Sequence, residues 1–493
     1  MNLGQRIRSG VKWLALGNMG SQIMQFLFGI ALARLLVPAD FGVIATVQVF
    51  TGFVGMLATG GMGQSLIRAK EADENQFNAV FTLQLLLGML IYAAFYAYAP
   101  WIAAYFGDPH YEDLLRVSAL SFLLRPFHFI RISWLNREML FRKRAFAEVT
   151  TGALTGLSSV MMAWAGMGVW SLVFAGLLGA LVNNALLARL TPLRLALRFD
   201  LGATRSHSAY GAKITINDFI GSMIGQVVTL ILSKLAGPTL LGLFNKAESL
   251  SRLPNRLIGP AVGQTIFPAM SKVQDDLDLT KYLFYRTVTL LLVYTAPLFV
   301  GLWWMAEPFI AFVYGEKWLP AAEPLRILAL AGFFINLGRP CSAVLAAQNR
   351  LFQEMIAQVV MLCVVATACF IGVRWGLTGV AWAALVAHAI GAAYFYVLVY
   401  RTLPTGVRDL VRAVAPAAAL NVPLFLLLAL IDGAIAPMKA GSPLLYLLLM
   451  AGGGGLAYAA AFLFLPVGAL RSEAARWRQQ LGAVFATARR GLP

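Results

Sequence analysis

Charged and polar side chains recur with helical spacing inside one strongly apolar stretch, residues 239–266. The residues that repeat at intervals of three and four positions are Asn245, Glu248, Ser249, Arg252 and Arg256. Such intervals place them on one face of a helix, where Glu248 can pair with Arg252 and Arg256 has no acidic residue one turn away. Lys246 lies beside this face and adds positive charge. Because guanidinium groups bind phosphate oxygens through paired hydrogen bonds, the pattern indicates a binding site for a phosphorylated anion.

A second apolar stretch, residues 113–135, contains Arg125 and Arg131. At a rise of about 1.5 Å per residue, Arg125 would lie near the middle of a bilayer, and Arg252 would lie roughly 20 Å below the outer end of its span. Charged groups at such depth are costly in lipid and usually face a water-filled interior. We therefore expect Arg125 and Arg252 to line a cavity. Arg131 and Arg256 could instead reach the cytoplasmic headgroups.

Other apolar stretches carry polar side chains that would complete this interior. The neutral ones near the start of the chain are Gln22, Gln25 and Gln48, and an acidic one, Asp218, lies in residues 210–235. Asp218 could take up a proton or serve as a structural partner of Arg252, and Glu248 is a second candidate for coupling to an ion.

Motifs for covalent or metal chemistry do not occur in the sequence. It contains no phosphate-binding loop, no nucleophile motif and no histidine or cysteine cluster with the spacing of metal ligands. We expect no catalytic residue, no metal site and no cofactor. Active transport would then draw on a gradient of H+ or Na+, on the membrane potential, or on consumption of the product.

The composition indicates the class of protein that contains these residues. Of the 493 residues, 59% are hydrophobic and 12% are charged, and the mean hydropathy is +0.74. Soluble domains contain about a quarter of charged residues, so a water-soluble core is excluded. Because a span needs about 20 apolar residues, the sequence predicts an all-α polytopic membrane protein of about 14 spans. These lie near 13–36, 41–66, 77–99, 113–135, 145–165, 168–189, 210–235, 239–266, 283–305, 320–346, 352–373, 377–399, 409–431 and 442–466.

The apolar sequence repeats itself 200 positions further on. Arg34-Leu35-x-x-Pro38-x-x-x-Gly42 with Gly63-Gln64 returns as Lys234-Leu235-x-x-Pro238-x-x-x-Gly242 with Gly263-Gln264. Weaker echoes follow, such as Leu115-Arg116 with Leu120 against Leu325-Arg326 with Leu330. Six spans separate the two starts, so the halves run in the same direction and predict parallel repeats around a cavity, as in many transporters.

The repeat also predicts how the chain is divided. We expect an N-lobe at 1–190, a cytoplasmic connector at 191–209, a C-lobe at 210–400, accessory spans at 401–466 and a basic amphipathic cytoplasmic tail at 467–493. Lys and Arg concentrate in alternate connections, which indicates that both termini are cytoplasmic. The net charge of +17 is therefore mainly a topology signal. Nucleic-acid binding is excluded, because the charges are spread over short connections instead of one soluble face.

Three short segments carry a resemblance to a known family. They are Leu32-Ala33-Arg34-Leu35-Leu36-x-Pro38-x-Asp40-Phe41-Gly42, Leu135-Asn136-Arg137-Glu138-Met139 and Leu241-Gly242-Leu243-Phe244-Asn245-Lys246-Ala247. In order and spacing they resemble Wzx-type polysaccharide transporters of the multidrug/oligosaccharidyl-lipid/polysaccharide exporter superfamily. The resemblance spans roughly residues 5–400.

The resemblance implies a MATE-like fold and a flippase of the bacterial inner membrane. Its substrate would be an undecaprenyl-diphosphate-linked oligosaccharide, moved by alternating access for exopolysaccharide or O-antigen export. Arginines would hold the diphosphate, polar spans would contact the sugars, and membrane lipids and polysaccharide polymerase or export machinery would be partners. One alternative is a MATE-like drug or cation antiporter, which would need an acidic interior. The other is a membrane glycosyltransferase or polymer ligase, which would need a long catalytic loop with paired acidic residues.

Overall fold

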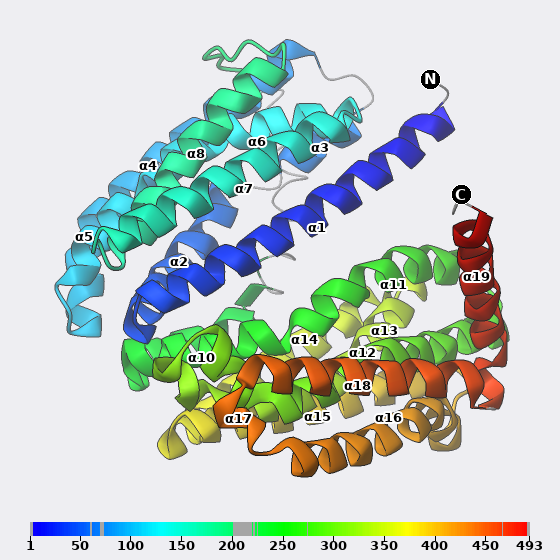
Figure 1. The fold of residues 1–493 in the computed structure, drawn as a ribbon. Coiled ribbons are helices and arrows are strands. Elements are labelled where there is room, and N and C mark those ends of the chain that lie inside the picture. The colour runs from blue at the N-terminus through cyan, green and yellow to red at the C-terminus, as the bar shows by residue number, and fades with distance from the viewer. Residues whose placement is uncertain are drawn as a thin grey trace. The chain divides into compact units, whose positions relative to one another are not determined.

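A computed structural model describes residues 3–59, 62–69, 73–200, 219, 222–223, 225–273, 275–465 and 467–490. Over these ranges the chain is helical and has no β-strand, as Figure 1 shows. Its internal contacts divide it into two compact parts, Met1–Asn245 and Lys246–Pro493, here called unit 1 and unit 2. The expected all-α architecture is confirmed for these residues, while the lobe boundaries drawn from the repeat remain a prediction.

Unit 1 consists mainly of apolar helices, most of them 15 to 33 residues long. In chain order they are α1 (Leu3–Leu35), α2 (Pro38–Thr59), α3 (Met62–Arg68), α4 (Glu74–Phe106), α5 (His110–Ala119), α6 (Ser121–Arg137), α7 (Phe141–Trp164), α8 (Trp170–Leu190), an unlabelled helix (Gly225–Leu235) and most of α10 (Gly237–Ser251). A core cluster forms where α4, α5 and α6 meet, with the rings of Phe95 and Phe122 5.2 Å apart. This packing fixes α6, the helix that carries Arg125.

Unit 2 has the same all-helical construction. Its elements are α11 (Leu253–Lys272), α12 (Leu277–Val313), η1 (Glu316–Ala321), α13 (Ala322–Ala347), α14 (Leu351–Gly372), η2 (Val373–Trp375), α15 (Gly376–Tyr400), α16 (Val407–Ile435), α17 (Met438–Gly441), α18 (Pro443–Phe464), η3 (Gly468–Leu470) and α19 (Arg471–Arg490). One core cluster joins α12, α13 and α16 through Phe284, Val344 and Leu420.

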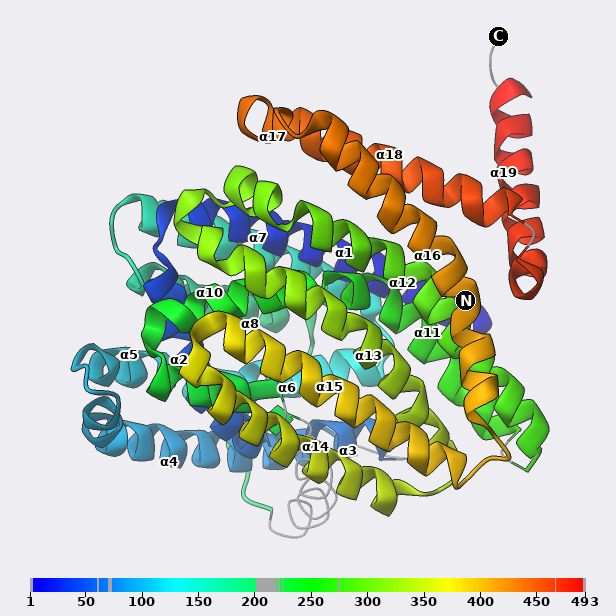
Figure 2. The same ribbon diagram turned by 90° about the horizontal axis from the view of Figure 1, so that it is seen from below.

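The accessory helices expected near the C-terminus pack on unit 2. Both α16 and α18 contact α12 and each other, and α19 follows at a steep angle to α18 (Figure 2). With α11 they enclose an apolar pocket of about 410 Å³, whose lining includes Leu257, Pro297, Leu424 and Met450. The two accessory helices α16 and α18 therefore pack on unit 2 and also border an apolar pocket.

Several helices differ in extent from the expected spans. The span expected at 239–266 is divided between α10 and α11, and Pro254 explains the break because it lacks a backbone N–H and crowds the carbonyl of Leu250. The span expected at 113–135 is likewise divided, between α5 and α6. Residues 60–61 of the span expected at 41–66, and residues 210–218, 220–221 and 224 of the span expected at 210–235, lie outside the described residues. Eight helical stretches that the structure describes are long and apolar enough to cross a membrane, so the count of fourteen is not established.

The repeated proline and glycine meet inside unit 1. A Cβ atom built on Gly42 of α2 would overlap the carbonyl oxygen of Pro238, and one built on Gly242 of α10 would overlap the carbonyl oxygen of Pro38. The starts of α2 and α10 thus cross backbone against backbone. Only residues without a side chain permit so close an approach, which explains the glycine of the repeated motif.

The first part of the expected connector runs alongside α4. Backbone N–H groups at alternate positions of residues 194–198 donate to side chains one turn apart on α4, namely Glu74 at 3.0 Å, Asn78 at 3.1 Å and Thr82 at 2.8 Å. These side chains provide hydrogen-bond acceptors for backbone N–H groups that have no partner in a helix or a sheet.

Candidate functional site

Arg125 lies between α6 and α2 in unit 1. Its Nη2 donates to the backbone carbonyl of Thr51 at 3.3 Å, and its guanidinium carbon is 5.3 Å from the ring centroid of Phe122. The guanidinium also occupies the space that a Cβ atom on Gly55 would need. Arg125 is therefore directed onto a neighbouring helix of its own unit, and Gly55 leaves the room in which the guanidinium sits.

This contact makes Gly55→Ala a test of how Arg125 is positioned. The new methyl group would meet the flexible end of Arg125, so the helix can remain in place while the guanidinium moves. If Arg125 is needed for the transport that the family resemblance implies, we expect Gly55→Ala to lower transport activity, with normal protein levels in the membrane. Gly52→Ala, one turn earlier on α2, meets no atom within 4 Å and is the matched control. Equal activity of the two variants would show that the position of Arg125 does not matter.

Hydrogen bonds hold α6 against α7 and α8. His128 Nδ1 lies 2.8 Å from Asn183 Oδ1, and Asn183 Nδ2 donates to Thr151 Oγ1 at 3.0 Å. Asn184 Nδ2 donates to the carbonyl of Leu124 at 3.0 Å. These hydrogen bonds link three helices, so they fix the rotation of α6 and with it the direction of Arg125.

Arg252 and Glu248 form the ion pair that their spacing on one helix face indicated. Arg252 Nη2 lies 2.7 Å from Glu248 Oε1, and 43% of the Arg252 side chain is exposed. Because Glu248 engages one guanidinium nitrogen, the remaining N–H groups of Arg252 can still donate to an anion. Arg256, one turn further along α11, is exposed.

Lys246 lies in an environment that the sequence did not reveal. Its Nζ is 4.6 Å from the ring centroid of Tyr314 and 5.0 Å from that of Trp318. Both rings come from the region where α12 ends and η1 follows. Aromatic faces attract an ammonium group, so these rings hold Lys246 within unit 2. Asn245, its neighbour on α10, is half-buried.

The other expected site residues that the structure describes lie on two helices of unit 1. Gln22 and Gln25 are exposed on α1, and Gln48 is exposed on α2. Asp218 lies outside the described residues. The structure adds Arg339 on α13, an exposed arginine that the sequence interpretation missed. A signal existed, because Arg339 is the one charged residue between Arg326 and Arg350.

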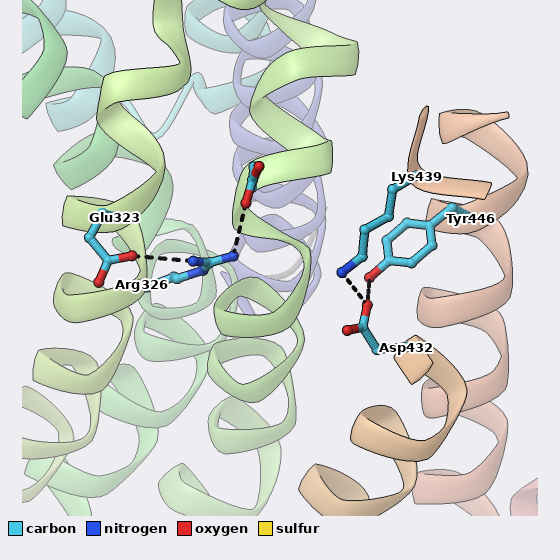
Figure 3. Close-up of polar contacts among 6 residues, drawn as sticks. Glu323, Arg326, Asp432, Lys439 and Tyr446 are labelled. Atoms are coloured by element: carbon cyan, nitrogen blue, oxygen red, sulfur yellow. Dashed lines mark hydrogen bonds and ion pairs between the residues drawn. The ribbon is translucent and has the colours of Figure 1, made fainter. Parts of the chain in front are cut away.

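Other charges of unit 2 compensate one another, as Figure 3 shows. Arg326 lies 3.3 Å from Glu307 and 3.2 Å from Glu323. Asp432 accepts from Lys439 at 2.7 Å and from the hydroxyl of Tyr446 at 2.5 Å. These clusters join helix ends within unit 2, and their opposite charges leave little net field for a ligand.

Comparison with known proteins relates this chain to proteins of polysaccharide biosynthesis. A family model described as polysaccharide biosynthesis protein matches residues 31–323. Lipopolysaccharide biosynthesis protein WzxC of Escherichia coli (strain K12) is 25% identical over 359 residues, which cover 71% of this chain and 72% of that protein.

Two solved structures have a fold similar to that of this chain. The lipid II flippase MurJ in an inward closed conformation has a TM-score of 0.68 at 16% identity, covering 91% of this chain and 98% of MurJ. A multidrug resistance MATE family transporter of the MOP superfamily, in an inward-facing conformation, has a TM-score of 0.57 at 14% identity, covering 79% of this chain and 98% of that one. The expected MATE-like membrane fold is thus confirmed. Because the family model covers more than half of the sequence, the chain belongs to the polysaccharide biosynthesis protein family.

Proposed function

We propose that this chain is a flippase for an undecaprenyl-diphosphate-linked oligosaccharide repeat unit. It would move this unit across the bacterial inner membrane by alternating access, for export of an exopolysaccharide or O-antigen. Its family is named for polysaccharide biosynthesis, WzxC carries a lipopolysaccharide biosynthesis name, and MurJ is a lipid II flippase. We expect no catalytic residue, because a flippase moves its substrate without changing it chemically.

The observation that carries the proposal is the setting of Arg125. Its guanidinium is held by a carbonyl, a ring and the gap at Gly55, and no carboxylate pairs with it among the residues that the structure describes. A positive charge within a membrane helix is costly unless an anion or water meets it. A diphosphate headgroup supplies that anion, and its release on the far side lets the cycle repeat.

Arg252 supports the same role in unit 2. Glu248 fixes one edge of its guanidinium, as a carboxylate commonly does for a ligand-binding arginine. The exposed edge can accept a phosphate, with Arg256 next to it and Lys246 and Asn245 on the preceding turns. Gln22, Gln25 and Gln48 would contact sugars.

The two alternative functions fit the described residues less well. A cation antiporter would need excess acid, whereas α6 has arginines without acids and α10 with α11 has one acid beside several basic residues. A glycosyltransferase would need free paired acids in an outer loop. Two of the acidic residues that follow α4 are already engaged, because Asp108 lies 3.0 Å from His110 and Glu112 binds Arg116 at 2.5 Å.

The proposed location follows from the charge pattern of the connections. Both termini would be cytoplasmic, and the basic α19 would lie at the inner leaflet. Membrane lipids are then direct partners, and polysaccharide polymerase or export machinery would take the flipped unit on the periplasmic side.

Coupling to H+ or Na+ would involve Asp218 or Glu248. If Asp218 is the ion site, Asp218→Asn removes the ionisable group and should abolish the dependence of transport on the external pH or sodium concentration. Initial rates measured over a range of both quantities test this. A variant that responds as the wild type does would leave Glu248 as the remaining candidate, and Glu248→Gln is the next variant.

Loss of the gene provides the test of the whole proposal. We expect lipid-linked repeat units to accumulate and extracellular polymer to disappear, as measured by mass analysis of extracted lipid-linked glycans. Complementation with the wild-type gene is the control. Disappearance of the polymer without lipid-linked precursors would point to a step before transport and contradict a flippase.

A further inference from the structure

Arg339 meets a glycine of the neighbouring helix in unit 2. A Cβ atom built on Gly259 of α11 would lie 2.9 Å from Arg339 Nη1. Arg339 itself is exposed and lies inside α13, next to Pro340. Its guanidinium thus lies against bare backbone of α11, in the way that the Arg125 guanidinium lies against Gly55 of α2.

The sequence repeat relates the two contacts. The echo that aligns Gly63 with Gly263 aligns Thr59 with Gly259, four residues after Gly55. The echo that aligns Leu120 with Leu330 aligns Phe129 with Arg339, again four residues after Arg125. In the second half, the glycine and the arginine each stand one helical turn later than in the first half, which is about 6 Å further along their helices. Because both positions differ by the same amount, a glycine still lies opposite an arginine in the second half.

Arg256 adds a second charge at this place. It stands three residues before Gly259, on the same face of α11, and like Arg339 it is exposed. No ion pair is recorded for Arg256 or Arg339 in the part of the chain that the structure describes, whereas Arg326 on the same helix as Arg339 has Glu307 and Glu323. Two neighbouring guanidinium groups without an acid repel each other unless an anion joins them.

We propose that Arg339, placed by Gly259 and assisted by Arg256, binds a phosphate group of the lipid-linked substrate. This inference rests on the proposed function and assigns the residue in α13 that contacts the headgroup. A diphosphate offers enough oxygens for both guanidinium forks, which bind phosphate through paired hydrogen bonds. The ligand class is therefore a prenyl diphosphate, distinguished from the corresponding prenyl alcohol by its charge.

Binding of geranylgeranyl diphosphate to the purified full-length protein tests the proposal, with geranylgeraniol as the uncharged probe. Arg339→Ala should weaken binding of the diphosphate by at least about tenfold, the loss expected for one charge-assisted contact. Arg339→Lys should recover part of the affinity, because it keeps the charge without the fork. Arg326→Ala, which removes an already neutralised arginine from α13, should bind the diphosphate as the wild type does. All variants should bind geranylgeraniol equally.

Gly259→Ala keeps every charge and moves only the Arg339 guanidinium, so it guards against misfolding of Arg339→Ala. It should weaken diphosphate binding and leave geranylgeraniol binding unchanged. If the wild type prefers the diphosphate and both variants bind it with wild-type affinity, the role of Arg339 is overturned while the flippase proposal stands. If the wild type does not distinguish diphosphate from alcohol, the anion-binding basis of the proposed function fails together with it.

Discussion

Arg125→Ala and Arg252→Ala are each expected to abolish polymer export while the protein still inserts and accumulates in the membrane. Each arginine would supply charge-assisted hydrogen bonds worth about 1.5–3 kcal/mol to the bound headgroup, so affinity should fall by roughly ten- to a hundredfold. Neither change opens a fully enclosed cavity, because Arg125 is only partly buried and the Arg252 side chain is 43% exposed. The measurements are extracellular polymer per cell and protein level in isolated membranes.

Arg116→Ala provides the matched control for the loss of one arginine from unit 1. Arg116 already pairs with Glu112 at 2.5 Å and stacks on the ring of Tyr96 at 4.4 Å, outside the proposed site. We expect export to persist in this variant. Wild-type export in both Arg125→Ala and Arg252→Ala would eliminate the anion site, since no charge would then be needed at either position.

Gly42→Ala and Gly242→Ala are expected to prevent the protein from accumulating in a folded form. At both positions the new methyl group would overlap a backbone carbonyl of the opposing helix, which cannot rotate away as a side chain can. Ordinary overpacking of a core costs about 1–3 kcal/mol, and a collision with backbone forces whole helices apart. Membrane levels should drop sharply, and any protein recovered should unfold at a lower temperature in detergent.

Gly52→Ala on the same helix as Gly42 separates this effect from a general cost of substitution. Its methyl group meets open space, and replacing glycine by alanine inside a helix favours the helix by about 0.5–1 kcal/mol. Its melting temperature should therefore equal or exceed that of the wild type. Normal folding of Gly42→Ala would mean that α2 and α10 do not cross at this glycine.

The sequence predicted the helices of this fold better than it predicted where they meet. Apolar length located the helices, because burial in lipid demands it, and the repeat marked Gly42 and Gly242 as special. A repeat states which residues correspond, however, and only the structure reveals that each glycine lies against the proline of the other copy. The break before Leu253 was within reach of sequence reasoning, since Pro254 cannot continue a helix without loss of a hydrogen bond.

For the candidate site, local relations were predictable and distant ones were not. The pair of Glu248 and Arg252 follows from a spacing of four residues on one helix. The rings around Lys246 belong to residues about 70 positions later, so no local pattern announces them. The sequence interpretation missed Arg339 because Arg339 is the one charged residue between Arg326 and Arg350. That interpretation relied on charged residues that recur on one helix face, as Glu248, Arg252 and Arg256 do.

Translocation in proteoliposomes tests the central claim most directly. A polyprenyl-diphosphate oligosaccharide with a fluorescent label on its sugar is placed in both leaflets, and dithionite added outside destroys the label only in the outer one. With wild-type protein, label from the inner leaflet should become accessible over time, and with Arg125→Ala it should stay protected as in protein-free liposomes. Protection that persists with wild-type protein, or its loss with Arg125→Ala at the wild-type rate, would contradict an arginine-dependent flippase.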